Sequence, residues 1–114
     1  MDDVYNKDFT LYVGSTFTEN IEFAKIYVDT EELGNYTLSA GMKLKSNTTL
    51  GFVIPVSIGN LNVDFTMLMP SSTSGAISPV GDYLYAVDLT DTDASITKTI
   101  LTGTITVKED ISNV

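Results

Sequence analysis

The sequence predicts an all-β fold, an antiparallel sandwich of two sheets. Apolar and polar residues alternate with period two along most of the chain, and no long stretch has the period of an amphipathic helix. Such one-sided alternation is typical of antiparallel strands with one face in the core and one in water. About seven or eight short strands, spaced roughly 8–12 residues apart, indicate an immunoglobulin-like β-sandwich, with a small Greek-key barrel as the alternative.

The first third of the chain contains two expected strands. Alternation runs from residue 8 to residue 13, a Gly-Ser turn follows, and a second strand spans residues 16–23. An acidic connection, residues 29–35, leads to the next strand. The side chains expected to face inward are Phe9, Leu11, Val13, Phe17, Ile21 and Phe23.

The middle of the chain contains the clearest amphipathic strand, residues 36–45. Residues 50–58 form a less regular strand, which Pro55 interrupts because proline cannot donate to a strand ladder; we expect an edge or a bulge there. Alternation returns over residues 61–69. The expected inward side chains are Tyr36, Leu38, Ala40, Met42, Leu44, Leu61, Val63, Phe65, Met67 and Met69.

A long polar connection, residues 70–82, precedes the closing pair of strands. Its Ala76, Ile77 and Val80 are expected to cover one end of the sandwich. Gly103 lies within a β-rich run and predicts a bulge, after which the inward parity shifts. On the first of these strands we expect the inward side chains to be Tyr83, Tyr85, Val87 and Leu89. On the second strand the residues of one parity before Gly103 are Ile96, Lys98 and Ile100. After Gly103 we expect Ile105 and Val107 to face the core.

Composition excludes several functions. The chain has 114 residues, enough for one domain (1–114) with short flexible ends, and a net charge of −9. It has no Cys, His or Arg, so disulfides, thiol nucleophiles, imidazole bases and bidentate phosphate clamps are all missing. Six lysines against fifteen acids make nucleic-acid binding a poor expectation, because such binding needs clustered positive charge.

Carboxylates are the plentiful reactive groups, but most fall in expected turns, where Asp caps the backbone. Asp88, Asp91 and Asp93 cluster near one turn and are weak calcium candidates, since hard cations bind several oxygens. Their spacing lacks the Gly and the closing Glu of an EF-hand loop. We therefore expect no catalytic residue, no cofactor and no dedicated metal site.

The chain carries no recognisable export or membrane segment. It opens MDDVYNKDF, which lacks the basic start and apolar run of a secretory signal. The longest weakly polar stretch, residues 50–58, is too short to span a bilayer. The simplest expectation is a product of the cytoplasm that later joins a larger assembly.

The order of these features resembles a family of small bacteriophage virion proteins, namely the N-terminal immunoglobulin-like domain of baseplate and tail-associated proteins of the upper-baseplate type. Residues 9–17 match its opening strand and Gly-Ser-Thr-Phe turn, and residues 36–45 match its Tyr-Thr strand. Residues 79–91 match its Pro-x-Gly-x-Tyr-x-Tyr strand, and residues 96–107 match its closing hairpin ending Gly-x-Ile-Thr-Val.

The resemblance covers roughly residues 8–112, and its motifs are structural rather than catalytic. It implies a non-enzymatic virion protein of the head, neck, tail or baseplate, made in the host cytoplasm, that docks to other virion proteins in a symmetric assembly, which can include further copies of itself. Two departures matter. The family's turn usually closes with a Gly that residues 91–94 lack, and the chain ends at Val114, which favours a complete small structural protein over a fibre anchor.

Two other functions remain open at this point. A carbohydrate-binding module would need two or three exposed aromatic side chains in line on one sheet face, with calcium near the three aspartates as an option. A small glycosidase or lyase would need a pocket with two carboxylates about 5–10 Å apart.

Overall fold

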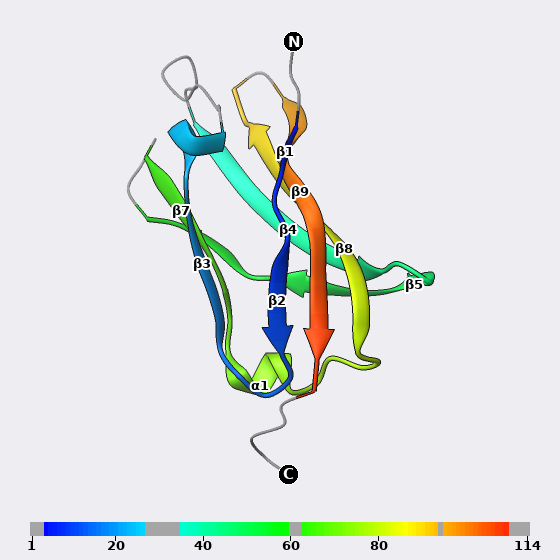
Figure 1. Cartoon of the computed structure of the whole chain (residues 1–114). Helices are drawn as coiled ribbons and strands as arrows, with labels where there is room; N and C mark the ends of the chain where they lie inside the picture. The colour runs from blue at the N-terminus through cyan, green and yellow to red at the C-terminus, as the bar shows by residue number, and fades with distance from the viewer. Residues whose placement is uncertain (1–3, 27–34, 60–62, 94, 110–114) are drawn as a thin grey trace.

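The structure is a computed structural model and describes residues 4–26, 35–59, 63–93 and 95–109. Most of these residues lie in β-strands (Figure 1). The elements are β1 (Tyr5–Asn6), β2 (Phe9–Tyr12), β3 (Phe17–Glu22), the 3₁₀ helix η1 (Phe23–Ile26), β4 (Tyr36–Leu44), β5 (Asn47–Ile54), β6 (Val56–Ile58), β7 (Asp64–Met69), α1 (Ser71–Ser74), β8 (Gly81–Asp91) and β9 (Ile96–Lys108).

The strands form two sheets, which confirms the predicted sandwich. The large sheet has the order β1/β2–β9–β8–β4–β5, and the small sheet has the order β3–β7–β6. The small sheet, β3–β7–β6, corresponds to strands B, E and D of an immunoglobulin domain. The strands β4, β8 and β9 of the large sheet correspond to strands C, F and G. All pairings are antiparallel except those of β1 and β2, which lie end to end along β9 and run parallel to it.

The core lies between the two sheets and contains the side chains that the alternation predicted for β4 and β8. On β8, every second residue is buried, from Tyr83 to Leu89. Phe23 and Phe65 pack with their rings tilted by 45° and centroids 5.3 Å apart, and Phe9 meets Phe17 edge to face at 5.9 Å. Each such aromatic or aliphatic side chain contributes about 1.5–3 kcal/mol by leaving water, so the core supplies most of the stabilisation.

Pro55 marks the point where the chain changes sheets. The strand β5 belongs to the large sheet and β6 to the small one, and only Pro55 separates them. Proline has no N–H to donate to a ladder, but its carbonyl accepts a hydrogen bond from the Leu68 N–H of β7 at 3.0 Å. The predicted interruption is confirmed, and both β5 and β6 are edge strands.

The predicted bulge at Gly103 is wrong, because the irregularity in β9 lies three residues earlier. Val87 of β8 pairs with Leu101, but the next residue, Asp88, pairs with Thr99, so Ile100 is the extra residue. As a result Ile100 and Leu101 are both buried although they are consecutive. The inward parity shifts at this bulge, and no turn-forming residue marks the position.

Gly103 serves a different purpose, since it lies on β9 beside the break between β1 and β2. A Cβ atom at this position would lie 2.0 Å from the carbonyl oxygen of Lys7. Lys7 and Asp8 form the break between β1 and β2, and two hydrogen bonds join this break to β9. The Lys7 N–H donates to the Thr102 carbonyl at 2.9 Å, and the Asp8 carboxylate accepts from the Thr104 N–H at 2.9 Å. The glycine therefore lets the backbone of Lys7 lie close against the backbone of β9.

Several smaller predictions need correction. Phe23 is buried as expected but lies in η1, which the sequence did not indicate. Val63 was expected to face inward, yet its side chain is 52% exposed because it precedes the first residue of β7. In the connection after β7, Ile77 is buried as expected, whereas Ala76 and Val80 are exposed.

A buried serine takes part in closing the end of the sandwich that Ala76 and Val80 were expected to cover. Ser74 is the last residue of the single-turn helix α1. Its hydroxyl donates to the carbonyl of Ser15 at 2.7 Å and accepts from the Gly14 N–H at 3.2 Å. These bonds attach the helix to the turn between β2 and β3, which lies beside it in Figure 1.

Three sets of expectations lie outside the described residues. They are the acidic connection near residues 27–34, the inward position of Leu61, and the ends, residues 1–3 and 110–114. In the part of the chain that the structure describes, no helix is long and apolar enough to cross a membrane.

The close approach of the Lys7 backbone to Gly103 predicts that one added methyl group at this position destabilises the fold. Gly103→Ala should lower the free energy of unfolding by about 1–3 kcal/mol, because the Lys7 backbone must move away from β9. Gly41→Ala, also in a strand of the large sheet, is the matched control, since its Cβ would approach only the Phe52 carbonyl, at 3.4 Å. Urea denaturation measures both; equal losses in the two variants would contradict the assignment.

Candidate functional site

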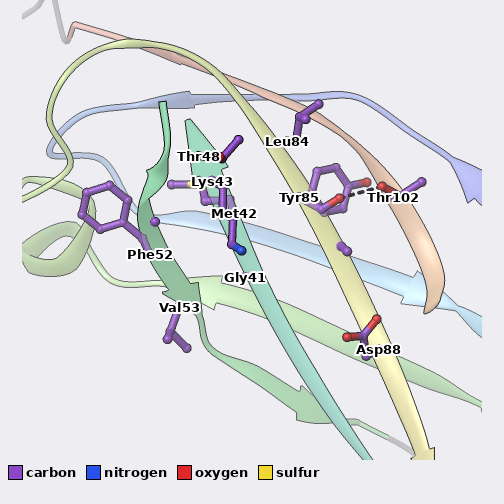
Figure 2. A pocket seen from close by; sticks show the side chains of 12 residues that line it. Gly41, Met42, Lys43, Thr48, Phe52, Val53, Leu84, Tyr85, Asp88 and Thr102 are labelled. Carbon is purple, nitrogen blue, oxygen red and sulfur yellow. Dashed lines mark hydrogen bonds between the residues drawn. The ribbon is translucent and has the colours of Figure 1, made fainter. Parts of the chain in front are cut away.

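The outer face of the large sheet carries a groove among the described residues. It has a volume of about 600 Å³ and opens between the β4–β5 hairpin and strand β8 (Figure 2). We call it the outer groove. Its lining comprises Gly41, Met42, Lys43, Thr48, Gly51, Phe52, Val53, Leu84, Tyr85, Ala86, Asp88 and Thr102.

The floor of the outer groove is a row of small residues. Gly41 of β4 pairs with Ala86 of β8, which pairs with Thr102 of β9, so three strands contribute neighbouring short side chains. The wall residues are larger, since Val53 is 76% exposed and Leu84 is 46% exposed. All lie at the outward positions of alternating strands, where the pleat directs them away from the core. The groove is thus a depression in the sheet face with apolar sides.

The groove contains one acidic and one basic side chain, and they are far apart. Lys43 pairs with Leu84, whereas Asp88 pairs with Ser39, four residues further along β4. At about 3.3 Å per residue this separates the two positions by roughly 13 Å. The Asp88 carboxylate also accepts a hydrogen bond from the Thr99 hydroxyl at 2.7 Å. The two charges do not form an acid–base pair.

Tyr85 lines the groove with its backbone, while its hydroxyl points to the opposite side of the sheet. The hydroxyl donates to the carbonyl of Lys7 at 2.5 Å. The Tyr85 carbonyl accepts from the Thr102 hydroxyl at 2.8 Å (Figure 2). Burial raises the pKa of the Tyr85 hydroxyl, and the negative charges of Asp8 and Glu19 raise it further. Tyr85 therefore acts as a neutral hydrogen-bond donor in the core.

The groove does not have the features of the two alternative functions. Asp88 is the one carboxylate among its lining residues, so these residues do not provide the paired acids of a glycosidase. Its aromatic side chains do not form a platform either, since Tyr85 is buried and Phe52 packs against the Tyr83 ring at 5.9 Å. Among the large apolar and aromatic residues that the structure describes as exposed, Tyr12 is the one aromatic.

The three calcium candidates are placed apart. Asp88 and Asp91 lie at positions of opposite parity on β8, so the pleat directs them to opposite faces. Asp91 accepts from the Asp93 N–H at 3.0 Å, and Asp93 accepts from the Asn35 N–H at 3.2 Å, as expected for turn residues. Within the described ranges, no group of three acidic side chains is arranged to hold a metal ion.

The sequence-based expectations did not identify the outer groove. Its floor residues, Gly41 and Ala86, occupy positions of two amphipathic strands that were expected to face solvent. The available signal was their size, because glycine and alanine are unusual on the exposed face of a strand. Which strands lie side by side cannot be obtained from spacing alone, so their convergence was not predictable.

Fold and site together define an immunoglobulin-like β-sandwich with a shallow groove on its larger sheet. No family model and no curated protein matches the sequence. The crystal structure of Listeria monocytogenes InlP is similar to it in fold, with a TM-score of 0.55 and 15% sequence identity. The similarity covers 92% of this chain but only 28% of the InlP chain, so the chain spans less than a third of that protein's length. At this identity the similarity concerns the fold alone.

The buried tyrosines predict a loss of stability at alkaline pH. Burial raises the pKa of both Tyr83 and Tyr85 above the ordinary value of 10.0. The unfolded chain therefore releases these protons at a lower pH than the folded one, and the free energy of unfolding should fall as pH rises above about 10. Denaturant titrations between about pH 8 and 11 measure this slope.

Tyr85→Phe should reduce that slope, because one of the two protons is removed from the linkage. It should also lower the free energy of unfolding at neutral pH by about 1–3 kcal/mol, since the Lys7 carbonyl loses its donor. Tyr12→Phe, which removes a hydroxyl from an exposed side chain, is the matched control. Identical slopes for Tyr85→Phe and the unmodified chain would contradict the prediction.

The separation of Asp88, Asp91 and Asp93 predicts no response to calcium. Calcium at about 5 mM, above the dissociation constants of weak extracellular sites, should leave the melting temperature unchanged. Differential scanning calorimetry with and without EDTA measures this, with magnesium as the ionic-strength control. A rise with calcium that Asp91→Asn abolishes would show that these residues bind it.

Proposed function

We propose that the chain is a non-enzymatic structural protein of a bacteriophage virion, located in the head, neck, tail or baseplate, that docks to other virion proteins in multiple copies. The observation that carries this proposal is the set of four sequence motifs over roughly residues 8–112 that resemble the upper-baseplate family. The all-β sandwich is the fold that this resemblance implies, and it is consistent with the proposal.

The motif residues perform structural work, as expected of a docking domain. In the motif of residues 79–83, the Tyr83 hydroxyl donates to the Pro79 carbonyl at 2.7 Å and closes the loop that precedes β8. Gly81 between them has a φ of +141°, which L-residues rarely adopt. In the first motif, Gly14 has a φ of +86° in the turn before β3. These features fix the conformation of the turns before β3 and β8.

The surface supports docking rather than catalysis. The outward positions of β9 are rich in threonine, with half-buried Thr102, Thr104 and Thr106 in succession. The hydroxyl groups of Thr102 and Thr106 are bonded to the Tyr85 carbonyl and the Asp82 carboxylate. The outer groove lies beside them and offers an apolar recess with few charges. A contact of this kind is weak in one copy, but repetition around a symmetric particle multiplies it through avidity.

The decisive experiment is analysis of particles purified from the phage or prophage whose genome encodes this chain. Mass spectrometry should detect the chain at a fixed stoichiometry to the major capsid or tail protein, and cryo-electron microscopy should place it on a symmetry axis or ring. A host cytoplasmic protein of similar abundance is the control for carry-over. Absence of the chain from intact particles would overturn the proposal.

A further inference from the structure

The four sheet edges of the sandwich differ in how they are protected from pairing with another chain. Exposed edges are usually guarded by charges, kinks, proline or short length. The β1/β2 edge is broken at Lys7 and Asp8, and β3 carries Glu19 and Glu22. The edge strand β6 is only three residues long and follows Pro55. Three of the four edges therefore have a recognisable guard.

The fourth edge, β5, has no charge and no proline, and its one irregularity lies at the hairpin end, between Asn47 and Gly51, whereas Gly51–Ile54 pairs regularly with β4. It is eight residues long, and its sequence, Asn-Thr-Thr-Leu-Gly-Phe-Val-Ile, contains neither a charge nor a proline. It ends the large sheet, so no described strand pairs with its outer side. Val53 and Leu50 are exposed on it. Figure 1 shows the tip of the β4–β5 hairpin projecting from the body of the sandwich.

The segment around β5 is free of charged residues. No charged residue occurs between Lys45 and Asp64, although the whole chain has a net charge of −9. Two copies of such an acidic chain repel one another over most of their surfaces. An approach through β5 brings no carboxylate of this segment against its equivalent in the other copy. Electrostatics therefore favours β5 as the surface through which identical copies meet.

We infer that β5 pairs antiparallel with β5 of a second copy of the chain, across a two-fold axis, and joins the two large sheets into one. A two-fold axis makes each strand the partner of its own equivalent, so this one edge supplies both halves of the ladder. Over Gly51–Ile54, where β5 pairs regularly with β4, alternate residues bond to β4 and the remaining N–H and C=O groups are directed outward toward the second copy.

The pairing also places apolar side chains at the new interface. Val53 stands on the outer face of β5, where it forms one wall of the outer groove. In the paired form the two grooves lie on one continuous sheet face, on either side of the axis. The interface is one strand wide and below the size of stable dimers, so a dissociation constant of about 0.1–1 mM is expected.

This inference does not rest on the virion proposal, and the two are tested separately. A weak self-association suits a protein that assembles in multiple copies, but it requires only the isolated chain. Absence of the chain from purified particles would not contradict the β5 pairing, and a strictly monomeric chain could still be a particle component.

Sedimentation equilibrium of the full chain between about 0.01 and 1 mM tests the pairing over the expected range of dissociation constants. The average mass should rise toward that of a dimer. Val53→Lys should weaken association at least about tenfold, because a lysine on an edge strand blocks pairing. This change alters the net charge from −9 to −8, so reduced general repulsion would act in the opposite direction.

Ile96→Lys is the matched control, since it makes the same charge change at a side chain of β9 that is 59% exposed. It should associate like the unmodified chain, and both variants should keep the far-ultraviolet circular dichroism of the folded domain. Added salt should strengthen association, because it screens the repulsion between the acidic bodies and no ion pair is broken.

Amide hydrogen exchange at high and low concentration locates the interface. Alternate amides of β5 should gain protection at high concentration. A mass that stays monomeric up to about 1 mM, equal association of Val53→Lys and Ile96→Lys, or new protection confined to another strand would each overturn the inference.

Discussion

The hydrogen bond from the Tyr85 hydroxyl to the Lys7 carbonyl is the contact on which the architecture depends. It joins residues 78 positions apart and reaches from β8 to the break between β1 and β2. Without the first strand, β9 would present thirteen residues of unpaired edge. Gly103 lets the Lys7 backbone approach β9, and Tyr85 holds it there. The closure of the large sheet on this side thus combines this hydroxyl and the missing side chain of Gly103 with the hydrogen bonds that join Lys7 and Asp8 to β9.

Charge has a definite distribution on this framework. The acids that the structure describes lie in turns, at strand ends or on strand faces, and Glu19 and Glu22 discourage pairing of β3 with another chain. The interior contains neutral tyrosines whose hydroxyl groups are used on backbone carbonyls. Missing Cys, His and Arg leave the outer groove with one lysine and one aspartate as its charged groups. The same composition that limits chemistry leaves a neutral edge at β5.

Much of the fold could be predicted because β4 and β8 alternate without interruption, which identified Tyr83, Tyr85 and Met42 as core residues. The break at Pro55 was also predictable, since proline cannot join a ladder. The bulge at Ile100 was not, because two consecutive apolar residues show no turn chemistry. The role of Gly103 depends on Lys7, almost the whole chain away, and the outer groove depends on three strands meeting. Such long-range contacts have no local signal in a single sequence.

The parallel pairing of β1 and β2 with β9 has a mechanical consequence. Tyr5 pairs with Leu101 at one end of the ladder and Tyr12 pairs with Lys108 at the other, so the chain enters and leaves the sandwich at opposite poles. A pulling force applied at Tyr5, where the chain enters, and at Lys108, where β9 ends, would slide these strands along each other. It would load the hydrogen bonds between them together, in shear, rather than opening them one by one. This geometry resists extension, a useful property wherever the domain carries tension between its neighbours.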